Sequence, residues 1–248
     1  MLLNDHLADT GETLFRWRSF VLTAFIPVIV FAIWMGEPIE LRFGETANTI
    51  YELACIGLVF AGVALRAYTV GFVPANTSGR NRKTQVADSL NTTGIYSVVR
   101  NPLYLANALG YVGAALYSQW LSIAVVMVIV LVLYFERIIA AEERFLLRKF
   151  GRDYSAWAER TPAFFPRWSN WTPPTLRFSW RTVLRREHSS WLGTLVLLYI
   201  LETVSMLSEG DHLADHPWPT WLMLVAFALQ VIILLVKRNT TLLNVEGR

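Results

Sequence analysis

Six apolar runs, each close to the length that a membrane-spanning helix needs, constrain this chain more than any other feature. A helix that crosses the hydrocarbon core of a bilayer takes about 20 mostly apolar residues. Because 54% of the side chains are apolar and only 17% are charged, a soluble domain of 248 residues is a poor alternative. We therefore expect an all-α, polytopic membrane protein of about six spans in one membrane domain (1–248). The runs cover residues 17–35, 50–72, 103–117, 121–141, 190–207 and 218–236.

Two neighbouring runs predict a tight helical hairpin. Residues 103–117 and 121–141 are separated only by residues 118–120, which leaves room for a turn between antiparallel helices and little else. Pro102 stands just before the first of these runs. Proline is favoured in the first turn of a helix, because its missing N–H would have no partner there. We expect the third span to start at this proline.

The division of charge between loops predicts the orientation in the membrane. Cytoplasmic loops are enriched in Lys and Arg, and six spans put both termini on one side. With the termini inside, Arg42 is the one basic residue in the outer loops, which are otherwise acidic. We expect a protein of the bacterial inner membrane with both termini cytoplasmic. The basic residues then placed inside are Arg16, Arg18, Arg80, Arg82, Lys83, Arg100, those in the cluster 144–186, Lys237 and Arg238.

Side chains within the runs have structural explanations. Arg66 lies near the inner end of the second run, where its long stem lets the guanidinium reach lipid head groups. Glu202, near the outer end of the fifth run, is interpreted in the same way. Cys55 is the only cysteine and stands in no metal-ligand spacing. We expect no metal site.

The polar segment before the third run is a candidate ligand site. Residues 76–94 are rich in Gly, Asn and Thr, which predicts a loop. Arg100, Asn101 and Tyr104 then surround the helix start at Pro102. A helix start offers free N–H donors and a positive dipole end to a carboxylate, and an arginine adds a two-pronged donor for the same group. The interfacial border of an ordinary membrane helix explains these residues equally well.

The polar segment after the fourth run carries a second group of charges. Glu136 and Arg137 lie where the apolar run ends, a depth at which ionisable side chains usually pair or line a cavity. Glu142 and Glu143 then alternate with apolar residues at helical spacing, so the helix is expected to continue past the membrane surface as an amphipathic arm. Gly151 is expected to end it. A solvated helix face is the alternative explanation for these charges.

Together the two segments resemble the isoprenylcysteine carboxyl methyltransferases and the phospholipid N-methyltransferases. The resemblance covers a methyltransferase-like core at residues 81–166, and it rests on the order, the spacing and the intervening hairpin rather than on any single piece. The residues that carry it are Gly94, Tyr96, Arg100, Pro102, Tyr104, Glu142, Glu143, Phe150, Gly151, Tyr154, Thr161, Pro162 and Pro166.

The resemblance implies an S-adenosylmethionine-dependent methyltransferase that acts on a membrane-embedded lipid or lipidated substrate at the cytoplasmic face. It places the cofactor beside the ends of the third and fourth spans. There Glu142 would accept hydrogen bonds from ribose hydroxyls or the amino group, and Tyr96 and Tyr104 would give aromatic surface to the sulfonium cation. The implied cofactor residues are Asp88, Ser89, Leu90, Asn91, Tyr96, Asn101, Pro102, Leu103, Tyr104 and Glu142, with Arg100 added for the cofactor carboxylate.

Two positions depart from the family pattern. Asn101 stands where the family usually has His, and Asn forms hydrogen bonds without changing charge near neutral pH. We expect it to position the cofactor. Ile138 stands where the isoprenylcysteine enzymes have an arginine for the substrate carboxylate, one place after Arg137. The methyl acceptor is therefore left open.

Methyl transfer depends more on alignment than on a dedicated base. An anionic acceptor would be oriented by Arg137, Arg144 or Arg80. An amine acceptor would need to lose a proton, and Glu143 is the nearest candidate base. Arg137 and Glu143 are thus the candidate catalytic residues.

Two other functions stay open from the sequence. One is a membrane reductase of the sterol or isoprenoid type, which has a similar C-terminal helical arrangement and uses NADPH, although this chain has no GxGxxG motif. The other is a non-enzymatic protein whose basic stretch 144–186 binds anionic lipid or a partner. We expect no nucleic-acid partner, and the oligomeric state is open.

Overall fold

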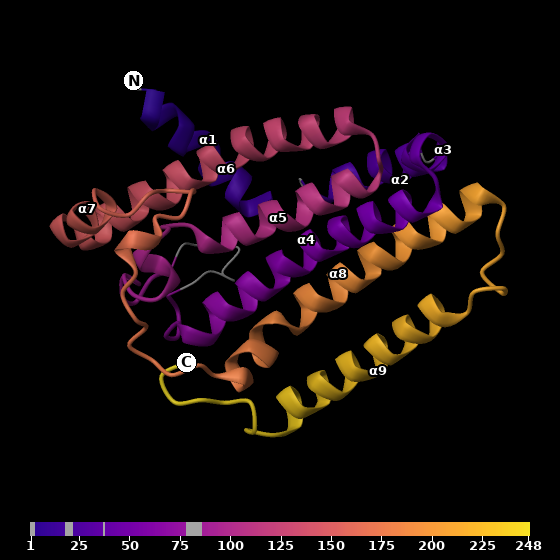
Figure 1. Ribbon diagram of the computed structural model, residues 1–248. Helices are drawn as coiled ribbons and strands as arrows, with labels where there is room; N and C mark the ends of the chain where they lie inside the picture. Colours follow the sequence, from indigo (N-terminus) through magenta and orange to yellow (C-terminus); the bar gives the residue numbers. More distant parts are fainter. Residues whose placement is uncertain (1–2, 18–21, 37, 78–85) are drawn as a thin grey trace.

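The computed structural model describes residues 3–17, 22–36, 38–77 and 86–248, which form a bundle of helices (Figure 1). Among these residues the only β-pairing is an isolated bridge between Gly94 and Thr172. The predicted all-α class is confirmed. The helices are α1 (Leu3–Trp17), η1 (Thr23–Phe25), α2 (Ile26–Trp34), α3 (Pro38–Phe43), α4 (Glu45–Phe72), η2 (Ile95–Ser97), α5 (Pro102–Tyr117), α6 (Leu121–Phe150), α7 (Arg152–Ala158), η3 (Trp168–Asn170), α8 (Trp180–Glu209) and α9 (Trp218–Asn239).

The helices make this an integral, multi-pass membrane protein. α5 is apolar but has only 16 residues. With α5 counted, about six spans result, as predicted. The first predicted run differs at its start, because the helical segment there begins at Thr23 and residues 18–21, with Arg18, lie outside the described residues. The stretches of the described chain that are long and apolar enough to cross a membrane are Thr23–Phe43, Glu45–Phe72, Leu121–Phe150, Trp180–Glu209 and Trp218–Asn239.

The predicted hairpin joins α5 to α6. Proline occupies the start of α5, and α6 continues to Phe150, with Gly151 following at a φ of 53°. In the connecting turn Gln119 has a φ of 60°, in the left-handed region. Its side chain donates to Asn48 Oδ1 at 2.6 Å and accepts from the Ile39 N–H at 2.9 Å. These two bonds tie the turn to α3 and α4.

α4 and α5 pack closely because glycines remove side chains from their contact. A Cβ built on Gly113 of α5 would lie 2.8 Å from Val59 Cγ2 and 2.9 Å from the Cys55 carbonyl oxygen of α4. One built on Gly62 of α4 would collide with the Ala106 carbonyl of α5. Small residues at such contacts let helix backbones approach within membranes. The start of α5 is thereby fixed against α4.

The apolar runs did not predict the N-terminal helix α1. It packs along α6, with Ala8 and Phe15 buried. On its polar side, Asp9 and Glu12 accept from Arg144 of α6 at 2.6 and 2.7 Å. An amphipathic helix therefore lies against the extension of α6 (Figure 1).

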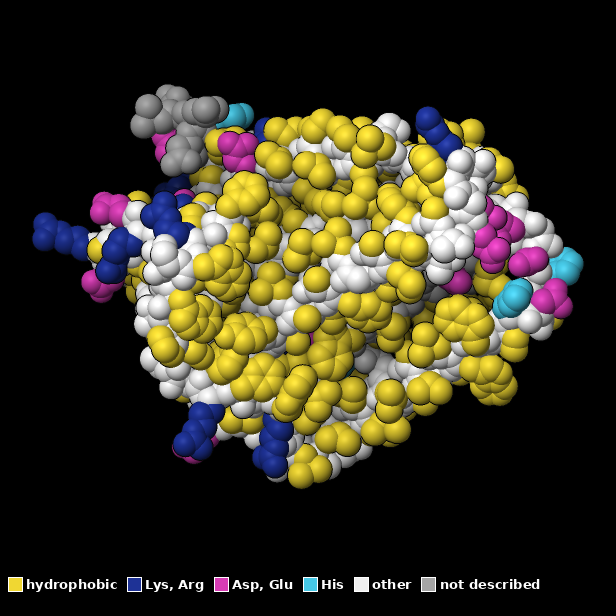
Figure 2. Space-filling model, in the orientation of Figure 1, with side chains coloured by type: hydrophobic (Ala, Val, Ile, Leu, Met, Phe, Trp, Pro, Cys, Tyr) yellow, Lys and Arg dark blue, Asp and Glu magenta, His cyan; other side chains and the backbone are white. Residues whose placement is uncertain are grey.

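The two ends of the bundle differ in charge. Figure 2 shows most of the visible Lys and Arg at the end that carries α7, where acidic side chains also lie, a group of acidic and His side chains at the opposite end, and a broad hydrophobic surface between the two ends. Both chain termini lie at the first of these ends (Figure 1). The start of α5, the C-terminal end of α4 and the N-terminal end of α8 lie at this same end (Figure 1).

Candidate functional site

A cavity of about 710 Å³ lies where α4, α5, α6 and α8 come together at the basic end of the bundle. Its size suits a small-molecule ligand, since such sites commonly measure roughly 300–1,000 Å³. Every predicted cofactor residue except Asp88 lines it. Those that do are Ser89, Leu90, Asn91, Tyr96, Arg100, Asn101, Pro102, Leu103, Tyr104 and Glu142.

The start of α5 forms one wall, and the segment after α7 supports it. The Arg100 N–H donates to the Pro162 carbonyl at 2.9 Å, and the Asn101 side-chain amide donates to the Ala163 carbonyl at 3.0 Å. Asn101 makes no side-chain cap of the helix. The helix start is therefore held from the outside while it lines the cavity.

Tyr104 and Glu142 meet across the cavity wall. The Tyr104 hydroxyl donates to Glu142 Oε1 at 2.8 Å, although 38 residues separate them. The Tyr104 ring lies 5.1 Å from the ring of Phe135, which fixes its orientation from the α6 side. The structure thus brings an aromatic face and a carboxylate together beside the helix start, as the sequence predicted.

The loop before α5 provides the opposite wall. Tyr96 is held through its carbonyl, which accepts from the Trp157 indole at 3.1 Å, and its side chain interacts with Asn91. Burial, and secondly the nearby Glu142 charge, raises the pKa of the Tyr96 phenol, so the phenol stays protonated and able to donate at neutral pH. Asp88 is exposed outside the cavity lining, where it accepts from Asn76 at 3.0 Å.

Arg100 lines the cavity but directs its guanidinium elsewhere. One terminal nitrogen donates to the Ala158 carbonyl at 2.9 Å, and the other lies 2.8 Å from Glu143. Both terminal nitrogens of Arg100 thus have protein partners here, and two-pronged donation to a ligand carboxylate stays a prediction. This partly exposed ion pair links α6 to the start of α5.

The two candidate catalytic residues do not line the cavity. Arg137 donates to the carbonyl of Leu133 in its own helix, and Glu143 faces Arg100. Arg144, the second candidate for orienting an anionic acceptor, is paired with α1 instead. Arg80 lies outside the described residues. The periodicity of α6 explains this outcome, because Glu142 and its neighbours point in different directions around the helix.

Sequence reasoning missed one group that does belong to the cavity. Arg66 of α4 and Asn107 of α5 line it, and Arg66 forms a double hydrogen bond with the buried Glu187 of α8. Arg66 was expected to reach lipid head groups, and that interpretation is wrong. Glu202 likewise pairs within the bundle, accepting from Tyr117 at 2.8 Å. The signal that pointed to Arg66 was an ionisable residue inside an apolar run, which by default indicates function.

Part of the chain matches a known protein family and two named relatives. The phospholipid methyltransferase family matches residues 53–153, which include α5, α6 and the loop between α4 and α5. The nickel-cobalt-cadmium resistance protein NccN of Alcaligenes xylosoxydans xylosoxydans is 39% identical over 154 residues, which make up 62% of this chain and 67% of that protein. The chain belongs to the phospholipid methyltransferase family.

A second relative of this family member is matched over a smaller share of its length. The cobalt-zinc-cadmium resistance protein CzcN of Cupriavidus metallidurans is 39% identical over 141 residues, which make up 57% of this chain. The match spans about half of CzcN, 51% of its length. No solved structure matches the chain.

The family match ends before α8. Residues 53–153 contain Arg66, Asn107 and Glu142 but not Glu187. In this family member the Arg66 network on the cavity wall therefore combines residues of the matched region with a helix that follows it.

Proposed function

We propose that the protein is an S-adenosylmethionine-dependent methyltransferase that acts on a lipid or lipidated substrate at the cytoplasmic face of a bacterial inner membrane. The observation that carries the proposal is the Tyr104–Glu142 hydrogen bond of 2.8 Å on the wall of a cavity at the start of α5. Membership of the phospholipid methyltransferase family supports the same chemistry. The gathering of Lys and Arg at this end of the bundle supports the cytoplasmic orientation.

The residues present suit the cofactor. Glu142 offers a carboxylate to ribose hydroxyls or an amino group, and Tyr104 and Tyr96 offer aromatic surface near a sulfonium. Asn101 would position the cofactor at the helix start, where backbone donors and the helix dipole favour its carboxylate. When bound, the cofactor would supply an activated methyl group on sulfur.

The chain's own contribution would be orientation and exclusion of water. Apolar side chains from helices α1, α2, α4, α5, α6 and α8 line much of the cavity, and alignment in a dry site accounts for much of the rate advantage in displacement reactions. A lipid would enter between helices with its head group near α5. Neither Arg137 nor Glu143 lines the cavity, and a role for them in orienting or deprotonating the acceptor stays a proposal.

A binding and transfer experiment tests the proposal. Purified full-length protein in detergent should bind S-adenosylhomocysteine in calorimetry and bind NADPH much more weakly. With cofactor labelled in its methyl group and a lipid extract of the host membrane, label should enter lipid, and mass spectrometry should show the gain of one methylene mass. Preferential NADPH binding would favour the reductase, and absence of both ligands would favour a lipid-binding protein without catalysis.

We propose in addition that the activity contributes to tolerance of metal ions such as cobalt and cadmium. The names of the two relatives support this role. In a host that carries the gene, deletion should lower the concentration of cobalt or cadmium that permits growth. The wild-type gene should restore growth and the Glu142→Gln variant should not. Equal restoration by both genes would separate metal tolerance from methyl transfer.

A further inference from the structure

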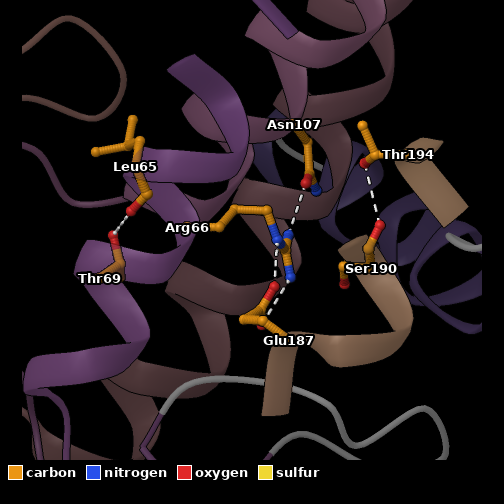
Figure 3. A network of polar contacts seen from close by, with 7 residues as sticks. All are labelled: Leu65, Arg66, Thr69, Asn107, Glu187, Ser190 and Thr194. Atoms are coloured by element: carbon orange, nitrogen blue, oxygen red, sulfur yellow. Dashed lines mark hydrogen bonds and ion pairs between the residues drawn. The ribbon is translucent and has the colours of Figure 1, made fainter. Parts of the chain in front are cut away.

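Three polar side chains from three helices meet on the cavity wall, deeper in the bundle than the Tyr104–Glu142 bond. Arg66 of α4 donates through Nε to Glu187 Oε2 at 2.8 Å and through Nη2 to Glu187 Oε1 at 3.2 Å. Through Nη1 it donates to Asn107 Oδ1 of α5 at 2.6 Å. Figure 3 shows the guanidinium between the two partners, with Glu187 at the N-terminal part of α8.

The guanidinium keeps donors for a ligand. Arginine has five N–H bonds, and the three hydrogen bonds to Glu187 and Asn107 use three of them. Among the described residues the other two have no hydrogen-bond partner. The Arg66 side chain is 20% exposed, against 2% for Glu187, and Arg66 lines the cavity whereas Glu187 does not. The carboxylate thus lies behind the guanidinium and holds it toward the cavity.

Stability alone is a poor reason for this network. A buried ion pair loses about as much free energy through desolvation as it gains from attraction, and apolar replacements are often neutral or stabilising. Ionisable residues within a membrane bundle usually mark a substrate or ion site. Arg186 of α8 lies close enough to interact electrostatically with both Glu187 and Arg66.

The position of the network relative to the helix start fits an acceptor site. Asn107 follows Tyr104 by three residues, so both point to one face of α5, and Asn107 lies about 4.5 Å further along the helix axis. Beyond it the lining of the cavity becomes apolar, with Gly110, Leu197 and Ile26. The Arg66 network therefore separates two parts of the cavity. One is the end beside Tyr104 and Glu142, where the methyl donor is proposed to bind (the methyl-donor end), and the other is an apolar end.

We propose that Arg66 binds an anionic oxygen group, phosphate or carboxylate, of an amphiphilic substrate whose hydrocarbon chain occupies the apolar end of the cavity. This inference rests on the proposed function, because that function places the methyl donor at the end of the cavity beside Tyr104 and Glu142. Arg66 contacts the substrate, and Glu187 and Asn107 are positioning residues that act through it. An amine head group would be disfavoured here, because the positive charge of the Arg66 guanidinium repels an ammonium group.

Charge-changing variants with opposite expectations test the proposal. The probes are dodecyl phosphate and laurate below their micelle concentrations, with dodecylamine, dodecanol and inorganic phosphate for comparison, and S-adenosylhomocysteine as a separate ligand. Arg66→Gln should weaken binding of the amphiphilic anions about tenfold to a hundredfold, as expected for lost charge-assisted hydrogen bonds. Arg66→Lys should restore part of it. Glu187→Gln should leave it unchanged or tighter, because the cation loses its counter-charge.

The controls separate binding from folding. Arg148→Gln removes an exposed arginine of α6 outside the cavity lining, and should leave anion binding unchanged. All variants are first compared with wild type by thermal unfolding and size-exclusion elution in detergent. S-adenosylhomocysteine affinity should change little in folded Arg66→Gln, since the contacts proposed for it are with Tyr104 and Glu142. Dodecyl phosphate should bind better than inorganic phosphate, and equal binding of the two would reject an amphiphilic substrate and point to free phosphate.

Several results would overturn the inference. Equal anion affinity of wild type and folded Arg66→Gln would do so, as would equal losses in Arg66→Gln and Glu187→Gln, which would indicate a structural bridge between α4 and α8. Preference for dodecylamine would also reject it. If wild type fails to bind S-adenosylhomocysteine while Arg66-dependent anion binding persists, the proposed methyltransferase function fails and the anion site stands.

Discussion

Replacing Glu142 with Gln should weaken S-adenosylhomocysteine binding about tenfold to a hundredfold and abolish most methyl transfer. The variant keeps the shape of the side chain but removes its charge, so the hydrogen bond from Tyr104 at 2.8 Å and any bond from the ligand lose their charge assistance. Hydrogen bonds to charged groups contribute about 1.5–3 kcal/mol. Calorimetry of the purified variant and transfer of labelled methyl to lipid measure the two effects.

A matched control comes from the same helix. Glu136 is exposed and does not line the cavity, so Glu136→Gln should bind and transfer as wild type does. Tyr104→Phe removes only the hydroxyl and should show a smaller loss than Glu142→Gln. Unchanged ligand affinity in a folded Glu142→Gln protein would remove this carboxylate from the cofactor site.

Placing a side chain at Gly113 should open the contact between α4 and α5 and destabilise the protein. The Cβ of Gly113→Ala would lie 2.8 Å from Val59 Cγ2 and 2.9 Å from the Cys55 carbonyl oxygen, closer than real Cβ contacts allow. Overpacking of this kind costs about 1–3 kcal/mol, and Gly113→Val should cost more than Gly113→Ala. Thermal unfolding in detergent measures the loss, and ligand binding should fall with it because α5 carries the helix start.

Gly57→Ala is the comparison for this change. Gly57 lies in α4. Apart from its chain neighbours and the nearby backbone of its own helix, no atom lies within 4 Å of a Cβ built there. Alanine is favoured over glycine in a helix by about 1 kcal/mol, so this variant should be as stable as wild type or more so. If Gly113→Ala matches Gly57→Ala, the α4–α5 contact is looser than the structure indicates.

Local signals in the sequence predicted the parts of the fold that depend on neighbouring residues. The length of the apolar runs, the proline at Pro102 and the glycine at Gly151 each act within a turn or two of helix. α1 was missed because it is short of apolar residues and becomes stable through its contact with α6. Its burial of Phe15 and its pairing with Arg144 are tertiary events.

The candidate site also has parts that the sequence predicted and parts that it could not predict. The motif pattern correctly placed Tyr104 and Glu142 together, since a hairpin of fixed length brings them to one end. The motif pattern could not predict where the side chains of Arg100 and Arg137 point. Arg100 donates to the Ala158 carbonyl and Arg137 to the Leu133 carbonyl, and these partners set the two directions. The Arg66–Glu187 pair spans 121 residues, and no local pattern relates two such positions.

The shortness of α5 has a consequence for how a lipid would reach the donor. Sixteen residues make a helix of about 24 Å, against a hydrocarbon thickness of about 30 Å. Such a mismatch is relieved by local thinning of the bilayer or by recessing the helix end below the surface. A lipid held beside Pro102 then keeps its acyl chains within the hydrocarbon layer. It avoids the cost of about 0.8 kcal/mol for each methylene drawn into water.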